Sequence, residues 1–200
     1  MAGRRKITLA RLDVVAHLLA QHDDTLLICG LGNTCWDVRT VSDRDEHFYL
    51  WGGMGGAAMI GLGLALAQPA RRVLVITGDG EMLMGMGSLA TIAVSKPKNL
   101  AIIVLDNERY GETGMQVTHT HHDTSLAEVA RASGISASRV VYTRKELETA
   151  TPKIFTGHGP TFTNVKVTET AGRTVLPPRH GTLLKDRFRS AVLGNDATTE

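Results

Sequence analysis

Cysteine is scarce in this chain of 200 residues, which contains only Cys29 and Cys35. Two cysteines are too few for a disulfide framework or for the thiolates that hold an iron–sulfur cluster. An excess of one charge is also lacking, because 22 basic residues face 20 acidic ones and leave a net charge of +2. This balance gives no electrostatic basis for binding nucleic acid or a membrane surface.

The chain also lacks a hydrophobic run of membrane-spanning length. Its longest apolar stretch, residues 52–67, is short for such a span and rich in glycine. The basic N-terminus has neither an uninterrupted apolar segment nor a small-residue cleavage site, so we expect no signal peptide. These features favour a cytoplasmic protein. The apolar fraction of 42% is sufficient for a single domain with its own core, which we expect to span residues 1–200.

Segments of strand length alternate with segments of helical character along the chain. The predicted strands lie at residues 26–30, 48–51, 71–77, 99–107, 139–142 and 160–167. The predicted helices lie at residues 9–22, 54–67, 81–95, 126–134, 144–150 and 183–194. This order predicts an α/β fold: a mainly parallel, six-stranded sheet with right-handed crossovers and helices on both faces. Functional loops in such folds follow the carboxyl ends of strands, here at residues 30–37, 78–81 and 106–114.

A Gly-Asp-Gly sequence directly follows one predicted strand. Gly78 and Gly80 let the backbone approach a ligand closely, and the helix expected next offers free N–H groups to a phosphate. Asp79 adds a carboxylate, which would repel a phosphate unless a cation lay between them. The next predicted strand ends in Asn107, at the same edge of a parallel sheet. Although each motif is also a common turn sequence, together they predict a diphosphate–Mg²⁺ site with oxygen ligands.

Residues 78–107 resemble the thiamine-diphosphate-binding motif, in which Gly-Asp-Gly is followed by an Asn at the end of the next strand. The glycine-rich residues 51–67 are similar to the loop and helix that precede this motif in thiamine-diphosphate enzymes. The resemblance covers nearly the whole chain but only one of the family's two core domains. It implies that Mg²⁺ is bound by side-chain oxygens of Asp79 and Asn107 and by the backbone carbonyl of Arg109.

The resemblance also implies how thiamine diphosphate is held. Backbone N–H groups of Gly80 and Glu81 would bind the diphosphate. The carbonyl of Gly52 would contact the 4′-amino group of the pyrimidine. Met54 would support the bent form of the cofactor, although core packing is the alternative for this side chain. The full set of implied cofactor-binding residues is Asn33, Thr34, Gly52, Met54, Gly78, Asp79, Gly80, Glu81 and Asn107.

The domain that the chain lacks supplies, in the family, a glutamate that hydrogen-bonds N1′ of the pyrimidine and so activates the cofactor. Glu46 lies on the wrong element for this role, and Glu112 lies on the diphosphate side. We therefore expect the activating glutamate on a partner subunit that carries the pyrimidine-binding domain, in an α2β2 or larger assembly.

Within the family, the chain is similar to the sulfopyruvate and phosphonopyruvate decarboxylases. The similarity lies in residues 61–67, 88–100, 105–120 and 177–193. It implies the diphosphate- and Mg²⁺-binding subunit of a two-subunit 2-oxo acid decarboxylase. Two alternatives remain open: a subunit of a thiamine-diphosphate carboligase or acyl-transferring dehydrogenase, and a non-catalytic α/β subunit that binds a Mg²⁺–nucleotide.

The polar loop at residues 107–124 departs from this group, because glycine usually follows soon after the Asn, whereas here Glu108 and Arg109 do. Its substrate contacts are therefore open, and Tyr110 and His119 are the candidates. A guanidinium such as that of Arg109 pairs well with carboxylate or sulfonate. The alternatives are a solvated polar loop and, at the His cluster His119, His121 and His122, a second metal. The adjacent His121 and His122 would point apart in an extended chain, which disfavours that metal.

Overall fold

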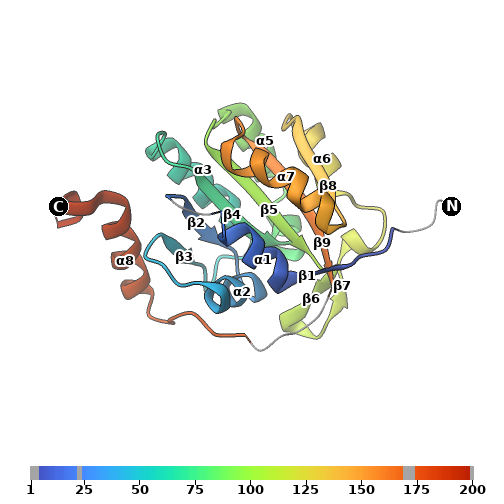
Figure 1. Ribbon diagram of the computed structural model, residues 1–200, viewed down its shortest axis with the longest axis horizontal. Coiled ribbons are helices and arrows are strands. Elements are labelled where there is room, and N and C mark those ends of the chain that lie inside the picture. Colours follow the sequence, from blue (N-terminus) through green and yellow to red (C-terminus); the bar gives the residue numbers. More distant parts are fainter. Residues whose placement is uncertain (1–4, 22–23, 169–173, 199–200) are drawn as a thin grey trace.

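The computed structural model describes residues 5–21, 24–168 and 174–198. A parallel sheet of seven strands runs through it in the order β1-β9-β5-β4-β2-β3, with β8 also paired with β9 (Figure 1). The strands are β1 (Leu9–Ala10), β2 (Leu26–Cys29), β3 (His47–Tyr49), β4 (Val73–Gly78), β5 (Leu100–Asp106), β8 (Ala137–Val141) and β9 (Thr161–Thr168). The predicted α/β class is confirmed, and the short β1 is added to the six strands expected.

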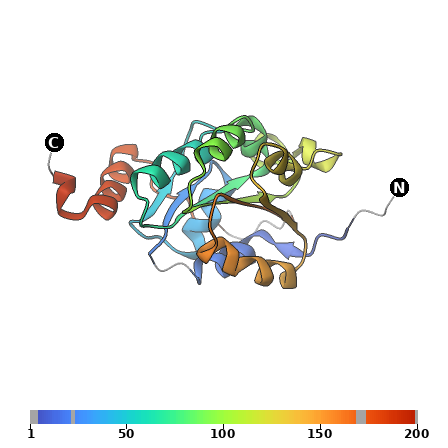
Figure 2. The same cartoon turned by 90° about the horizontal axis from the view of Figure 1, so that it is seen from above.

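Helices cover both faces of the sheet, so the molecule has three layers (Figure 2). One face carries α1 (Arg11–Leu19), α2 (Asn33–Val41) and α7 (Arg144–Thr156). The other carries α3 (Ala57–Ala67), α4 (Asp79–Met84), α5 (Ser88–Ser95) and α6 (Leu126–Ala132). The last helix, α8 (Gly181–Leu193), lies beyond the β3 edge and projects from the body (Figures 1 and 2).

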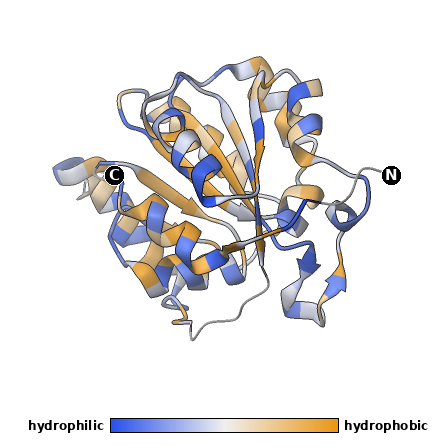
Figure 3. Cartoon of the chain, turned by 45° about the vertical axis from the view of Figure 1, so that its right-hand side comes forward, coloured by the Kyte–Doolittle hydropathy of each residue, from blue (hydrophilic) through white to orange (hydrophobic). Residues whose placement is uncertain are grey.

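Alternating strand residues build two separate cores. Leu27 of β2 faces the α1–α2–α7 layer, whereas its neighbours Leu26 and Ile28 face the α3–α6 layer. All seven residues of β5 are buried. A central parallel strand covered on both faces needs such a continuous apolar run, which is why these segments were readable as strands. The apolar colour of the strands in Figure 3 shows the same pattern.

Several sequence predictions differ from the structure. Helix α7 continues to Thr156, beyond the end expected at residue 150. The helix expected at residues 81–95 is two helices, α4 and α5, because the backbone of Gly85 packs against that of Gly55 and leaves no room for a side chain. Helix α2 was not predicted, since its Asn-Thr start and its glycine before it favour a turn. Helix α1 ends at Leu19, and position 22, where an end was expected, lies outside the described residues.

The loop predicted at residues 107–124 contains local structure. Two short strands, β6 (Arg109–Tyr110) and β7 (Gln116–Val117), form an antiparallel hairpin around the 3-10 turn η1 (Gly111–Thr113). A second 3-10 turn, η2 (His119–His121), follows. The hairpin lies below the carboxyl ends of the main strands in Figure 1. Among the described residues no helix is long and apolar enough to cross a membrane.

Candidate functional site

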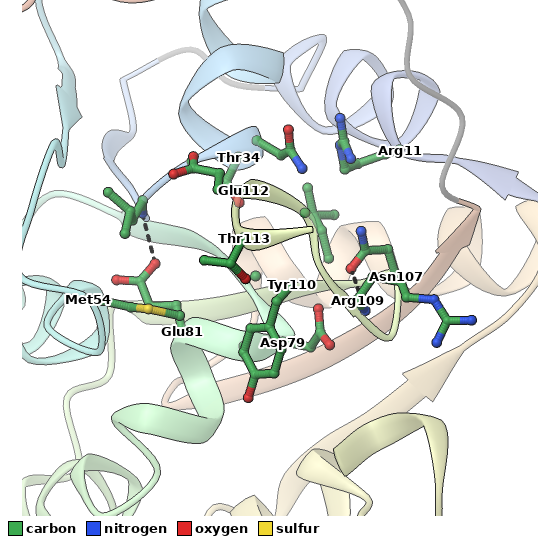
Figure 4. A pocket seen from close by; sticks show the side chains of 17 residues that line it. Arg11, Thr34, Met54, Asp79, Glu81, Asn107, Arg109, Tyr110, Glu112 and Thr113 are labelled. Atoms are coloured by element: carbon green, nitrogen blue, oxygen red, sulfur yellow. Dashed lines mark hydrogen bonds between the residues drawn. The ribbon is translucent and has the colours of Figure 1, made fainter. Parts of the chain in front are cut away.

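A cavity of about 160 Å³ lies at the carboxyl ends of β4 and β5, between the hairpin and the start of α2 (Figure 4). Ten residues that the sequence singled out line it: Asn33, Thr34, Met54, Gly78, Asp79, Gly80, Glu81, Asn107, Arg109 and Tyr110. The cavity thus gathers the three predicted loops at one edge of the sheet. Gly52 and His119, which the sequence also singled out, do not line it.

Asp79 is the first residue of α4, and its carboxyl group is almost fully buried. Thr118 donates a hydrogen bond of 2.6 Å to Oδ2, and the hydroxyl of Thr120 lies 3.3 Å from the same oxygen. Burial raises the pKa of Asp79 to about 7, and the nearby charge of Asp106 adds to this shift. A buried carboxyl group of this kind is ready to bind a cation, which would stabilise its ionised form.

Asn107 lies beside Asp79 because β4 and β5 are paired in parallel, with Gly78 opposite Leu105. The backbone then turns sharply: Oδ1 of Asn107 accepts a hydrogen bond of 3.1 Å from the N–H of Arg109. Glu108 between them has a left-handed φ of 62°. The turn therefore places the Asn107 side chain in the same cavity as the buried carboxylate, and both side chains offer oxygen ligands that suit Mg²⁺.

Charged side chains behind this turn support it. The carboxylate of Asp106 is fully buried, and its Oδ2 lies 2.8 Å from both Nζ of Lys166 and Nδ2 of Asn164. Lys166 also pairs with Glu108 at 2.9 Å, and His121 contacts the other carboxylate oxygen of Glu108 at 3.1 Å. Carboxylates on both sides of Asn107 are thus anchored to one lysine of β9.

Glu81 connects α4 to the loop after β2. Its Oε2 accepts hydrogen bonds from Oγ1 of Thr77 at 2.8 Å and from the N–H of Leu31 at 2.9 Å. Burial raises the pKa of Glu81, and these two hydrogen bonds counter the shift. The side chain therefore stabilises one wall of the cavity, while its backbone N–H lies in the first turn of α4.

The opposite wall is the start of α2, where Gly32 has a φ of 77° and no side chain caps the helix. The first N–H groups of this nine-residue helix, at Asn33 and Thr34, lie at an end that favours an anion, and the carboxylate of Glu112 lies beside Gly32 at the same end. Beside them Arg11 forms a buried ion pair with Asp37, with Nη2 3.2 Å from Oδ1. Arg11 also lines the cavity and was not expected from the sequence.

Gly80 lies against the side chains of Tyr110 and Met54, which both line the cavity (Figure 4). A Cβ atom on Gly80 would lie 2.5 Å from a ring carbon of Tyr110 and 3.6 Å from the Met54 methyl. Only glycine fits under this ring. The side chain of Met54 is 36% exposed, and a Cβ atom on Gly52 would meet nothing within 4 Å. The loop before α3 thus borders open space in which a further group has room.

His119 is exposed, whereas His121 and His122 border a separate polar cavity with Asp123, Glu108 and Lys166. The two imidazoles are in edge-to-face contact, with centroids 5.3 Å apart. The described part of the chain holds no group of three or more His, Cys, Asp or Glu side chains placed to bind a metal. The His cluster therefore lies behind the Asp106–Lys166 pair, away from the main cavity.

The donor set at the main cavity fits Mg²⁺ and a diphosphate. A carboxylate and an amide oxygen lie together, the uncapped start of α2 faces them, and the buried Asp79 lacks a cation partner among the described residues. Sequence reasoning missed Arg11, Thr118, Thr120 and Lys166. One signal was available: Asn164 and Lys166 are two residues apart in β9, which places two polar side chains on one side of that strand.

Residues 32–165 match the family described as thiamine pyrophosphate enzyme, C-terminal TPP binding domain. The chain is 40% identical over 126 residues to the sulfopyruvate decarboxylase subunit beta of Methanocaldococcus jannaschii; the match covers 62% of this chain and 66% of that relative. It is 35% identical to phosphonopyruvate decarboxylase of Streptomyces viridochromogenes, across 98% of this chain and 50% of that one. The chain thus spans about half to two thirds of these relatives.

Solved structures share the fold. The benzoylformate decarboxylase of Polynucleobacter necessarius superposes with a TM-score of 0.66 at 20% identity, over 86% of this chain and 35% of the other. Taken with the buried Asp79 beside Asn107 and the matched residues 32–165, these similarities establish the family. The chain belongs to the thiamine pyrophosphate enzymes and carries their C-terminal TPP-binding domain, whose cofactor is thiamine diphosphate with Mg²⁺.

Proposed function

We propose that this chain is the diphosphate- and Mg²⁺-binding subunit of a two-subunit, thiamine-diphosphate-dependent 2-oxo acid decarboxylase. The observation that carries the proposal is that Asp79 and Asn107, which follow the paired ends of β4 and β5, line one cavity with the uncapped start of α2. The names of the relatives, which include sulfopyruvate decarboxylase subunit beta, support the reaction and the two-subunit form.

Mg²⁺ would be held by the side chains of Asp79 and Asn107 and by the backbone carbonyl of Arg109. The diphosphate would be bound by N–H groups at Gly80 and Glu81 and by those at the start of α2, where Asn33 and Thr34 lie. Gly78 would allow the backbone to approach the diphosphate closely. These donors come from three different loops, so the fold must be intact for the site to exist. The bound cofactor supplies a nucleophilic carbon and accepts the electrons released when CO₂ leaves.

Gly52 and Met54 would hold the pyrimidine end of the cofactor, through the carbonyl of Gly52 and the side chain of Met54. The space next to Gly52 and the exposure of Met54 support this assignment.

Residues 1–200 would form a single domain of the diphosphate-binding type, located in the cytoplasm. Tyr110, next to Gly80, is the favoured substrate contact, and His119 is a weaker one because it is exposed outside the cavity.

The partner subunit would carry the pyrimidine-binding domain and the activating glutamate, in an α2β2 or larger assembly. Helix α3 supports this proposal, because no residue from Ala57 to Ala67 has a polar side chain. Met59, Ile60 and Leu66 are exposed, and Met59 and Leu66 are seven residues apart, which places them on one side of the helix. An exposed apolar helix face marks an interaction surface. Glu81 and Glu112, the carboxylates in the cavity besides Asp79, lie on the diphosphate side.

A substrate with two anionic groups would suit the cavity. Arg109 lines it, and guanidinium pairs bidentately with carboxylate, sulfonate or phosphonate; Arg11 also lines it, with its guanidinium already paired with Asp37. Sulfopyruvate and phosphonopyruvate, which name the relatives' reactions, are therefore the first 2-oxo acids to assay, with pyruvate and benzoylformate for comparison.

The proposal is tested by ligand-dependent thermal unfolding of the full chain together with its co-purified partner. Thiamine diphosphate with Mg²⁺ is expected to raise the melting temperature, since a ligand that binds the folded state stabilises it. ADP or ATP with Mg²⁺ is expected to have no effect. Stabilisation by the nucleotides alone would support the Mg²⁺–nucleotide alternative and contradict the proposal. A complex that binds the cofactor but transfers acyl groups without free aldehyde would favour the dehydrogenase alternative.

A further inference from the structure

We propose that Thr118 and Thr120 are positioning residues of the metal site, and that their hydroxyl groups fix the carboxylate of Asp79 in the orientation that binds Mg²⁺. Neither residue belongs to the Gly-Asp-Gly…Asn motif, and both follow it in the chain. The inference rests on the proposed Mg²⁺–diphosphate site and goes beyond it, by assigning the geometry of that site to two residues outside the ligand set.

The hydroxyls of both threonines meet the same oxygen of Asp79. Thr118 donates to Oδ2 at 2.6 Å, and Oγ1 of Thr120 lies 3.3 Å from it. All three side chains are buried. The terminal torsion of an aspartate side chain is broad and soft, so a carboxylate without partners rotates easily. The hydrogen bond from Thr118 removes that freedom, while the hydroxyl of Thr120, whose proton goes to Asp106, lies against the same oxygen and limits its movement. Neither contact changes the charge of the site.

Thr118 is placed by the hairpin that also carries Arg109. In the hairpin, Arg109 pairs with Val117, the residue before Thr118. The N–H of Thr118 then donates a hydrogen bond of 3.0 Å to the carbonyl of Glu108. Glu108 lies between Asn107 and Arg109, which are both proposed ligands. The turn at Asn107 and Arg109 and the hydroxyl of Thr118, which orients Asp79, are therefore held together by the same hairpin.

Thr120 is anchored from the opposite side by β9. Nζ of Lys166 donates a hydrogen bond of 3.2 Å to its carbonyl, and its hydroxyl donates one of 2.7 Å to Oδ1 of Asp106. Lys166 and Asn164 in turn hold Oδ2 of Asp106. The hydroxyls of Thr120 and Thr118 are 2.9 Å apart. A continuous set of buried contacts thus runs from β9 to Asp79.

This arrangement predicts a specific defect when a hydroxyl is removed. Partners that orient metal ligands typically contribute about 10–100-fold to metal affinity. Mg²⁺ requires near-ideal octahedral geometry, whereas Ca²⁺ accepts flexible coordination. Thr118→Val is therefore expected to weaken Mg²⁺ binding by about 10–100-fold and to weaken Ca²⁺ binding less. Thr120→Val should act in the same direction but less strongly, because its contact with Asp79 is longer.

The experiment titrates Mg²⁺ and, separately, Ca²⁺ into the full chain with its partner at saturating thiamine diphosphate. Binding is followed by calorimetry and by tryptophan fluorescence, so the readout does not depend on turnover. Trp51 directly precedes Gly52, and Trp36 lies in α2. Thr118→Ser and Thr120→Ser keep the hydroxyl and should bind Mg²⁺ like the wild type. Thr149→Val, on the exposed surface of α7, is the matched control.

The inference is overturned if folded Thr118→Val binds Mg²⁺ within twofold of the wild type, or if the serine variants are as weak as the valine variants. If a valine variant does not fold, the smaller Thr118→Ala and Thr120→Ala changes provide the same test. Absence of Mg²⁺-dependent cofactor binding in the wild type itself would instead refute the proposed site, and with it this inference. Wild-type binding with equal weakening of Mg²⁺ and Ca²⁺ would show a general structural defect and contradict positioning.

Discussion

Oε2 of Glu81 accepts a hydrogen bond of 2.9 Å from the backbone N–H of Leu31. This contact connects α4, which begins within the Gly-Asp-Gly sequence, to the loop between β2 and α2. Because Thr77 donates to the same oxygen, the carboxyl end of strand β4 is part of the contact as well. The side chain of Glu81 thus connects α4 to the loop between β2 and α2, the two segments that would hold the diphosphate. The backbone N–H of Glu81 would bind the same diphosphate.

Replacement of Glu81 by Ala is expected to destabilise the chain by about 2–3 kcal/mol, because it leaves the partly buried N–H of Leu31 and the buried hydroxyl of Thr77 without their acceptor. Glu81→Gln keeps an acceptor oxygen and should cost about 1 kcal/mol. Urea unfolding of the metal-free proteins measures both. Equal stability of the Ala variant and the wild type would show that the connection between α4 and the β2 loop is not stabilising.

The buried pair of Arg11 and Asp37 leads to a second prediction. Asp37 is 1% exposed, and Arg11 counters the rise that burial causes in its pKa. Arg11→Met leaves an uncompensated buried carboxylate and should cost about 3–5 kcal/mol of unfolding free energy. The double variant Arg11→Met with Asp37→Leu should recover most of that loss. A double variant that is as unstable as the sum of both single changes would contradict the pairing.

The pH dependence of stability follows from Asp79, whose pKa rises from 3.8 to about 7 in the folded chain. Between these values the folded state holds a proton that the unfolded state has released. The unfolding free energy of the metal-free chain should therefore decrease as pH rises from about 4 to 7 and stay level above, by a contribution on the order of 4 kcal/mol. Raised pKa values of Glu81 and Asp37 act in the same direction.

Asp79→Asn is the control for this prediction, since an amide does not titrate. Urea unfolding at pH 5, 6 and 8 should give a weaker pH dependence for the variant than for the wild type. Mg²⁺ with thiamine diphosphate should bind more tightly as pH rises towards 7, because the metal displaces the proton from Asp79. Identical pH dependence of stability in both proteins would place the titrating group elsewhere.

The apolar face of α3 gives a prediction about assembly. Met59→Glu or Leu66→Glu places a charge in the proposed interface and should abolish association with the partner, without lowering the stability of the chain itself. Leu183→Glu on α8 is the control, since Leu183 is also exposed but lies at the far β3 edge. Sedimentation of the mixed subunits measures association. Loss of the complex with Leu183→Glu, and not with the α3 variants, would move the interface to α8.

The sequence predicted the central strands well because β4 and β5 are continuous apolar runs that end in polar residues. It also gathered Asp79 and Asn107 at one edge, since adjacent parallel strands end together. Helix α2 escaped prediction because Gly32, Asn33 and Thr34 read as a turn. Contacts between distant segments, such as Arg11 with Asp37 or Thr118 with Asp79, depend on the packed structure and leave little local pattern.

The split active site is the central claim, and CO₂ release from 2-oxo acids tests it most directly. The chain alone, the partner alone and their mixture would be assayed with thiamine diphosphate and Mg²⁺, using sulfopyruvate and phosphonopyruvate first. The account predicts that CO₂ is released by the mixture and by neither subunit alone, and that Asp79→Asn in this chain abolishes it. Full decarboxylase activity of this chain in the absence of any partner would contradict the account.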